Sequence, residues 1–422
     1  MNLYLFNAND SAATYGIGSY LRELTRALEG ADINIRIVHL HAARPEFEIV
    51  KTGRVENWYV PEVRHRNTFS GSVQKLEDYY HNVVYLLRLH IKDTKDLIFH
   101  FNYNQSYFLA EKLKTVFECK TVATVHFIKW MLELQGNLSR WQRLKSKPEN
   151  QRSPFEQLLY TTDEYEGLLY KEVDRVIALS QYTRVLLCSE YQLKPDKVTV
   201  IRNGLEDISS DMETDKNVLR RKRHISDKEK VILFVGRLHA AKGLFFLIDA
   251  FHKVLETIPD CRLLVVGNGN FESCLKETKN SCAKITFTGL LEKEALHELY
   301  LLSDIGVLPS LTEQCSYVVM EMMRHGLPVI GTTGLKEMIT DGETGLQIPV
   351  TEYDDHSEID TALLAEKMRY LLQHPAEAKQ MGQNGRECYL SEYSMDVFRW
   401  NMPEFYRSLF TSDNKKKLAY AQ

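Results

Sequence analysis

Short apolar runs recur along the chain and alternate with longer amphipathic stretches. In the first half these runs cover residues 3–6, 34–40, 97–101, 120–127, 175–180 and 197–201. Stretches of helical periodicity separate most of them, and strands joined in this way pair in parallel, because a hairpin cannot reach a parallel neighbour. The first half therefore predicts an open α/β sheet.

The second half repeats this rhythm after a densely charged segment, residues 206–230, which we interpret as a linker. The apolar runs VILFVG, RLLVVG, KITFTG, IGVLP and LPVIG each meet a turn residue, and most then lead into a helical stretch. They are continuous rather than alternating, as in strands that are covered on both faces. The pattern predicts an α/β protein with two Rossmann-like, doubly wound domains facing across a cleft. The first domain spans residues 1–205, joined by a C-terminal helix at 394–412, and the second spans residues 231–393.

Composition narrows the classes of protein that remain. The chain has 422 residues, a net charge of −4, 44% apolar residues and 26% charged residues, which is the balance of a soluble globular protein. No overall basic field favours nucleic acid as a partner, and no run of 18 apolar residues or N-terminal export signal is present. The seven cysteines never form a C-x-x-C pair, so neither a disulfide framework nor a structural zinc site is expected. These features fit a cytoplasmic protein.

A cationic loop follows the first strand of the second domain. In VGRLHAAKG, Arg237 and Lys242 lie between the end of a strand and a helix that begins near Gly243. A guanidinium and an ammonium beside a helix N-terminus suit a diphosphate. The alternative is an ordinary solvated loop that happens to carry an Arg and a Lys.

Two carboxylates stand in the mostly apolar stretch SLTEQCSYVVMEMMRHGLPVI. Burying an unpaired carboxylate is costly, so Glu313 and Glu321 need hydrogen-bond partners. We expect a helix to begin near Cys315 or Ser316, with free backbone N–H groups at residues 314–318. Sugar hydroxyls suit Glu313 and a ribose diol suits Glu321. In the alternative interpretation, one carboxylate pairs with an arginine and the other is exposed.

The motifs together resemble a known family. The strings VGRLHAAKG, VVGNGN, FTGLL, SDIGVLPSLTEQCSYVVMEMMRHGLPVIGT and ITDGETGLQI, in this order, resemble the C-terminal domain of the retaining GT-B glycosyltransferases of family 4. The resemblance continues upstream in VIRNGLE, IALSQYT, TVATVHF and YGIGSY, so it covers nearly the whole chain.

The resemblance implies a role for each motif. The first domain would bind the acceptor and the second a nucleotide sugar. Glu313 would contact the transferred sugar, Glu321 the ribose, and Arg237 with Lys242 the diphosphate. His126 would approach the sugar from the first domain. The remaining donor-binding positions would be Gly16, Gly18, Leu290, Cys315, Ser316, Tyr317 and Val318.

The expected activity is hexosyl transfer from a nucleotide-diphosphate sugar, most simply a UDP- or GDP-sugar, to a glycan, glycolipid or peptide, with retention and without a metal or other cofactor. QCSY after Glu313 departs from the family pattern, which leaves the donor open. Alternatives are a sugar-nucleotide epimerase of this fold and a non-catalytic sugar-nucleotide-binding protein. A glycoside hydrolase would not need the cationic loop.

Two other features are weaker signals. His100, at a strand end, is expected to be a structural residue with its ring nitrogens satisfied. The segment 129–152 mixes basic residues with Trp130 and Trp141, which is compatible with peripheral contact at the inner face of a membrane. It shows no clean amphipathic stripe, so a solvated loop is the favoured interpretation.

Overall fold

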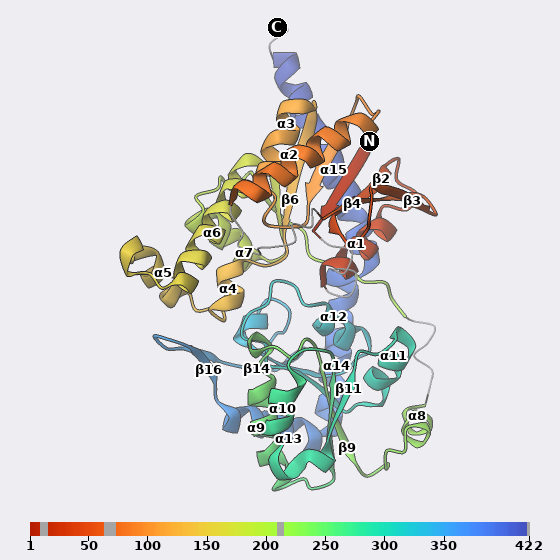
Figure 1. Ribbon diagram of the computed structural model, residues 1–422. Helices are drawn as coiled ribbons and strands as arrows, with labels where there is room; N and C mark the ends of the chain where they lie inside the picture. The colour runs from red at the N-terminus through yellow and green to blue at the C-terminus, as the bar shows by residue number, and fades with distance from the viewer. Residues whose placement is uncertain (9–15, 63–72, 209–214, 420–422) are drawn as a thin grey trace. The chain divides into compact units, whose positions relative to one another are not determined.

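The computed structural model describes residues 1–8, 16–62, 73–208 and 215–419, and these residues form two compact units. Unit 1 contains residues 1–128, 152–204 and 395–422, and unit 2 contains residues 129–151 and 205–394. Both units are α/β, with Rossmann-like parallel sheets, so the predicted fold class is confirmed (Figure 1). None of the described helices is long and apolar enough to cross a bilayer.

Unit 1 is built on an eight-stranded sheet of order β3-β4-β2-β1-β5-β6-β7-β8. All neighbouring strands are parallel except β3 and β4, which form an antiparallel hairpin at one edge. The apolar runs predicted as strands are all strands, whereas the more polar β3 and β4 were not predicted. The strands are β1 (Asn2–Asn7), β2 (Asn34–Ala42), β3 (Glu48–Thr52), β4 (Val55–Pro61), β5 (Leu97–Phe101), β6 (Cys119–Val125), β7 (Arg175–Ala178) and β8 (Val198–Val200).

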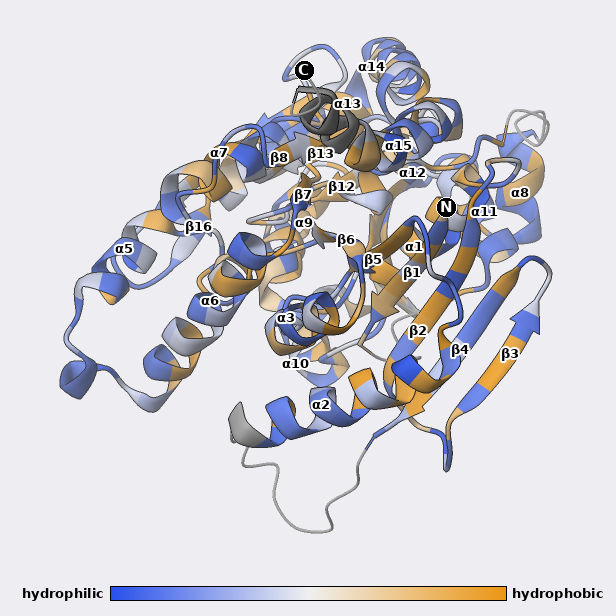
Figure 2. Cartoon of the chain, turned by 90° about the horizontal axis from the view of Figure 1, so that it is seen from above, coloured by the Kyte–Doolittle hydropathy of each residue, from blue (hydrophilic) through white to orange (hydrophobic). Residues whose placement is uncertain are grey.

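The helices of unit 1 cover this sheet and include the long C-terminal helix α15. They are α1 (Gly16–Ala27), α2 (Val73–His90), α3 (Tyr107–Val116), α6 (Pro154–Glu172), α7 (Gln181–Glu190) and α15 (Met395–Ala419). Every residue of β5 is buried, and Figure 2 colours the central strands β1 and β5 mainly in the hydrophobic shade. Continuous apolar strands are stable here because both faces are removed from water.

Unit 2 has a six-stranded, all-parallel sheet of order β11-β10-β9-β12-β13-β14. The chain order reverses at β9, whose neighbours are β10 and β12, so the topological switch point of this sheet lies at β9 and β12. Strand β14 and the separate hairpin β15–β16 were not predicted. The strands are β9 (Lys230–Val235), β10 (Cys261–Val266), β11 (Ile285–Gly289), β12 (Ile305–Leu308), β13 (Val329–Thr332), β14 (Gly345–Ile348), β15 (Val350–Glu352) and β16 (Ser357–Ile359).

The helices of unit 2 come from two parts of the chain. Two of them, α4 (Lys129–Glu133) and α5 (Leu138–Ser146), lie between β6 and α6 in sequence. Their connection is held by buried Asn137, whose amide donates to the carbonyl oxygens of Tyr353 (2.7 Å) and His356 (3.1 Å) at the β15–β16 turn. The other helices are α8 (Lys216–Lys222), α9 (Leu244–Leu255), α10 (Phe271–Glu277), α11 (Lys293–Leu302), α12 (Tyr317–Arg324), α13 (Thr361–Gln373) and α14 (Pro375–Cys388).

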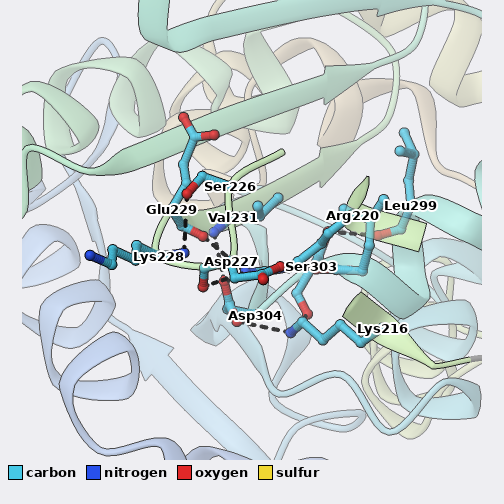
Figure 3. Close-up of polar contacts among 11 residues, drawn as sticks. Lys216, Arg220, Ser226, Asp227, Lys228, Glu229, Val231, Leu299, Ser303 and Asp304 are labelled. Carbon is cyan, nitrogen blue, oxygen red and sulfur yellow. Dashed lines mark hydrogen bonds and ion pairs between the residues drawn. The ribbon is translucent and has the colours of Figure 1, made fainter. Parts of the chain in front are cut away.

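The charged segment that we interpreted as a linker contains helix α8, which is fixed to unit 2 by an ionic cluster (Figure 3). Asp304 accepts hydrogen bonds from Lys216 (2.8 Å), Arg220 (2.7 Å) and the backbone N–H of Val231 (2.7 Å). Arg220 is buried, and it also donates to the carbonyl oxygens of Leu302 and Glu229. Burial raises the pKa of Asp304, but these donors outweigh it, so the net pKa lies below the usual value.

Candidate functional site

The cationic loop after β9 packs directly against the loop after β12. Gly243 adopts a left-handed conformation (φ 69°), and a Cβ there would lie 2.0 Å from the carbonyl oxygen of Pro309. The backbone N–H of Leu311 donates to the carbonyl oxygen of Ala241 (2.9 Å). Only glycine allows this approach, which brings the two loops together at the switch point of the sheet, where open α/β sheets bind ligands.

Glu313 is held by two donors from these loops. Ser310 Oγ donates to Oε1 of Glu313 (2.7 Å), and the ammonium of Lys242 forms a short ion pair with the same oxygen. Among the described residues, no hydrogen bond reaches Oε2 of Glu313. The side chains of Lys242 and Glu313 retain 20% and 13% of their exposure, so the carboxylate is fixed through one oxygen in a largely buried pair.

Arg237 and His239 complete the cationic loop. Arg237 is exposed, and His239 caps the 3-10 helix Ala240–Lys242 by accepting from the N–H of Ala241 (3.2 Å). Burial, followed by the nearby charge of Arg237, lowers the pKa of His239, which favours the neutral ring that this cap requires. The positive charge of the loop is therefore carried by Arg237 and Lys242.

Helix α12 begins where the sequence predicted. Ser316 is its N-cap residue, and Cys315 and Ser316 are buried, whereas Tyr317 and Val318 in the first turn are half-buried. The backbone N–H of Ser316 donates to the sulfur of Met338 (3.1 Å), so the expectation of free N–H groups at residues 314–318 is wrong for Ser316. The buried side chains of this helix are Val319, Met320, Met322 and Met323.

Glu321 lies on this helix and is half-buried. Its Oε2 accepts a hydrogen bond from the hydroxyl group of Tyr300 on α11 (2.6 Å). Both glutamates therefore have partners other than arginine, and neither is left exposed on the surface.

The α4–α5 segment contacts the loop that carries Glu313. The amide of Gln314 lies 3.5 Å from the sulfur of Met131, and a Cβ on Gly136 would lie 3.2 Å from Cβ of Thr312. This part of the chain thus supports the carboxylate loop, although it follows β6 in sequence. Figure 2 colours α5 largely in the hydrophilic shade.

In unit 1, His126 follows β6 and is anchored by Asn102, which follows β5. Nε2 of His126 lies 3.0 Å from Oδ1 of Asn102, and the ring packs edge-on against Tyr20 at 4.6 Å. Burial lowers the pKa of His126 to about 3. Asn104 fixes the next residue by donating to the carbonyl oxygen of Phe127 (2.7 Å). His126 is therefore a neutral imidazole in a defined orientation at neutral pH.

His100 is fully buried, and both of its ring nitrogens have partners. Nδ1 lies 2.7 Å from the hydroxyl of Tyr406, and Nε2 lies 2.7 Å from Oγ1 of Thr124. Burial, together with the nearby His126, lowers its pKa to about 3. The expectation that His100 is a satisfied structural residue is confirmed.

The other predicted positions are distributed between the two units. Gly16 begins α1 and Gly18 lies in its first turn, but residues 9–15, including Tyr15 of the YGIGSY motif, fall outside the described residues. Leu290 is 60% exposed directly after β11. Unit 2 brings Arg237, Lys242, Glu313 and the start of α12 to one edge of its sheet, whereas His126, Gly16 and Gly18 belong to unit 1.

Several supporting residues were missed by the sequence analysis. Ser310 and Tyr300 hold the two carboxylates, and Asn102 and Asn104 hold the histidine loop. The strand-end position of Ser310 and both asparagines was a usable signal, because ligands gather at the carboxyl ends of parallel strands. Nothing in the sequence pairs Tyr300 with Glu321. Over the described ranges, no group of three or more His, Cys, Asp or Glu side chains could hold a metal ion.

Comparison with known proteins identifies both halves of the chain. Residues 215–388 match the family model described as glycosyl transferases group 1, and residues 14–207 match the model of glycosyltransferase family 4. A glycosyltransferase of Methanocaldococcus jannaschii, itself uncharacterised, is 34% identical over 192 residues, covering 43% of this chain and 49% of that protein. A D-inositol 3-phosphate glycosyltransferase of Corynebacterium efficiens is 32% identical over 237 residues, covering 53% and 54%. These matches span about half the length of the curated relatives.

Solved structures match over nearly the whole chain. A sucrose-phosphate synthase of Thermosynechococcus elongatus superposes with a TM-score of 0.75 at 21% identity, covering 98% of this chain and 100% of that one. The HepE protein of Anabaena, solved in complex with UDP and glucose, has a TM-score of 0.67 at 16% identity, covering 97% and 100%. At these identities the likeness establishes the fold.

Proposed function

Because the chain belongs to glycosyltransferase family 4, we propose that it transfers a sugar from a nucleotide-diphosphate donor to an acceptor hydroxyl with retention and without a metal. The observation that carries this proposal is the pairing of Lys242 with Glu313 at the switch point of the unit 2 sheet. This edge offers cations for a diphosphate next to a fixed carboxylate for sugar hydroxyls.

Unit 2 would bind the donor. Arg237 and Lys242 would hold the diphosphate, and the backbone at the start of α12 would add N–H donors with the favourable end of the helix dipole. Glu313 would accept from a sugar hydroxyl through the oxygen that Lys242 and Ser310 leave available. Glu321 would accept from the ribose hydroxyls. A solved relative in complex with UDP and glucose makes a UDP-sugar the first donor to test.

The proposed chemistry is a front-face substitution. The bond from the anomeric carbon to the phosphate oxygen breaks, and its electron pair stays on that oxygen. The acceptor oxygen bonds to the same face of the anomeric carbon, and its proton passes to the departing phosphate. Arg237 and Lys242 would stabilise the charge that develops on the leaving group. Neutral His126 would contribute its carbonyl or ring to the sugar, as the family resemblance assigns it.

Direct binding and product analysis test this proposal. We expect UDP-glucose, GDP-mannose or ADP-glucose to raise the melting temperature, because a ligand at a hundredfold excess over its Kd adds about 2.7 kcal/mol to the free energy of unfolding. Transfer of the preferred sugar to a panel of glycan, glycolipid and peptide acceptors should then give a product with the donor's anomeric configuration, read from the NMR coupling constant.

Each other outcome has a clear meaning. Failure of every nucleotide sugar to bind would refute the proposal. Binding followed by a changed sugar with no acceptor present would indicate an epimerase instead. Binding with no turnover on any acceptor would favour a non-catalytic sugar-nucleotide-binding protein.

A further inference from the structure

Two aromatic residues, Tyr300 and His325, form hydrogen bonds with Glu321, one with its side chain and one with its backbone. The hydroxyl group of Tyr300 donates to the Glu321 carboxylate (2.6 Å), and Nδ1 of His325 donates to the Glu321 backbone carbonyl (2.6 Å). The two aromatic rings stack on each other, with centroids 4.7 Å apart and planes at 25°. Tyr300 comes from α11 and His325 caps the C-terminus of α12, so two helices fix one glutamate.

The hydrogen-bond directions in this cluster follow from the chemistry of the groups. A carbonyl oxygen can only accept, so Nδ1 of His325 carries its proton and Nε2 is an acceptor. Nε2 lies 2.7 Å from Nδ1 of His297, which therefore donates. Burial lowers the pKa of His325 to about 3, so this arrangement persists at neutral pH.

Tyr300 carries its hydroxyl group at a buried position, where a polar atom must be hydrogen-bonded. Its ring is almost fully buried, and a phenylalanine would fill the same volume with no polar atom to satisfy. Burial raises the pKa of Tyr300 well above its usual value, so it remains a hydrogen-bond donor. By engaging Oε2 it limits rotation of the Glu321 carboxyl group, which would otherwise have several orientations.

We propose that Tyr300 is a positioning residue that orients the Glu321 carboxylate for the ribose hydroxyls of the donor. This inference rests on the proposed function, because it requires a nucleotide at Glu321. The inference adds Tyr300, on a different helix from Glu321, as a residue on which discrimination between ribose and 2′-deoxyribose depends. Tyr300 does not contact the sugar nucleotide itself, and it acts through Glu321.

The test measures the affinities of UDP and 2′-deoxy-UDP by calorimetry, or those of the guanosine pair if GDP-mannose is the preferred donor. Wild-type protein should bind the ribonucleotide about tenfold more tightly, the worth of one hydrogen bond to a charged group. Tyr300→Phe should reduce this ratio to about two, mainly through weaker binding of the ribonucleotide. In turnover, the donor KM should rise while kcat stays within about twofold.

Tyr389→Phe is the matched control, since its buried hydroxyl donates to the Leu205 carbonyl in the same unit (2.8 Å). This control should keep the wild-type ratio. If Tyr300→Phe does not fold, Tyr300→Met removes the hydroxyl group with a flexible apolar side chain and leaves Glu321 intact, and it should cause the same loss of discrimination.

The outcomes separate this inference from the function on which it rests. If wild-type protein binds neither nucleotide, the proposed function fails and the inference fails with it. If both bind but wild-type protein does not discriminate, the ribose role of Glu321 is overturned together with the positioning role of Tyr300, and nucleotide binding as such stands. If wild-type protein discriminates and Tyr300→Phe keeps the full ratio, only the positioning role is overturned.

Discussion

Lys242 and Glu313 form an ion pair between the loops after β9 and β12, the two strands at the switch point of the unit 2 sheet. In the proposed reaction the two groups serve different parts of the donor, the diphosphate and the sugar. With these roles, the two subsites would adjoin. The contact also fixes the carboxylate, because Ser310 donates to the same oxygen.

Replacing Lys242 by Ala should slow the proposed transfer by about 10²–10³-fold, because the leaving group loses a fixed cation. Steady-state kinetics with saturating acceptor measure this effect. Lys253→Ala is the matched control, since Lys253 pairs with Asp249 on α9, away from the two loops, and should retain wild-type rates. A fully active Lys242→Ala variant would contradict the role of the cationic loop.

Replacing Glu321 by Gln should raise the donor KM more than it lowers kcat. A ribose contact is made equally in the ground state and in the transition state, so its loss weakens binding without slowing chemistry. Glu298→Gln, which disturbs a surface cluster with Lys222 and Arg223, controls for a general loss of charge. A normal KM with a collapsed kcat would assign Glu321 to the chemical step instead.

Chelation should leave the proposed activity within about twofold of its starting value, because Arg237 and Lys242 supply the charge that a divalent ion supplies in other glycosyltransferases. Initial rates before and after dialysis against EDTA test this expectation. Complete loss of activity, with recovery on addition of Mg²⁺ or Mn²⁺, would show that these side chains are insufficient.

Replacing Asp304 by Ala should lower the free energy of unfolding by about 3–5 kcal/mol, because the guanidinium of Arg220 would stay buried without its counter-ion. Urea titration followed by circular dichroism measures the change. Asp396→Ala removes a carboxylate that pairs with Arg399 at the surface and should cost about 1 kcal/mol or less. Equal effects of the two substitutions would mean that the cluster in Figure 3 does not fix α8.

Acid should destabilise the protein below pH 6.5. Burial lowers the pKa of His100, His126 and His325 to about 3, so these rings stay neutral in the folded protein while the unfolded chain takes up protons. The free energy of unfolding should therefore fall as the pH drops from 6.5 towards 3, by about 1.4 kcal/mol per pH unit for each histidine.

Thermal melts of wild-type protein and His100→Gln across this range test the acid prediction. The variant should be less stable at pH 7, but its stability should depend less steeply on pH. A pH-independent stability of the wild type between pH 6.5 and 4 would refute the prediction.

The sequence by itself determined the two α/β units, because parallel strands that are buried on both faces must be continuous apolar runs. It also indicated the start of α12 and the loops that carry Arg237, Lys242 and Glu313, since ligand-binding residues of such sheets follow the strands. It missed β3, β4 and β14, which lie at or next to the edges of their sheets, and the separate β15–β16 hairpin, because apolar patterning does not mark strands that are short or polar.

Only the tertiary structure decided which groups meet. Lys242 reaches Glu313 because Gly243 lets two loops, distant in sequence, pack together. Tyr300 contacts Glu321, and Asn137 fixes the α4–α5 segment to the β15–β16 turn. The spacing of these elements along the chain does not predict either contact. Helical and strand periodicity is local, whereas a hydrogen bond between elements depends on how the sheet order and packing bring their surfaces together.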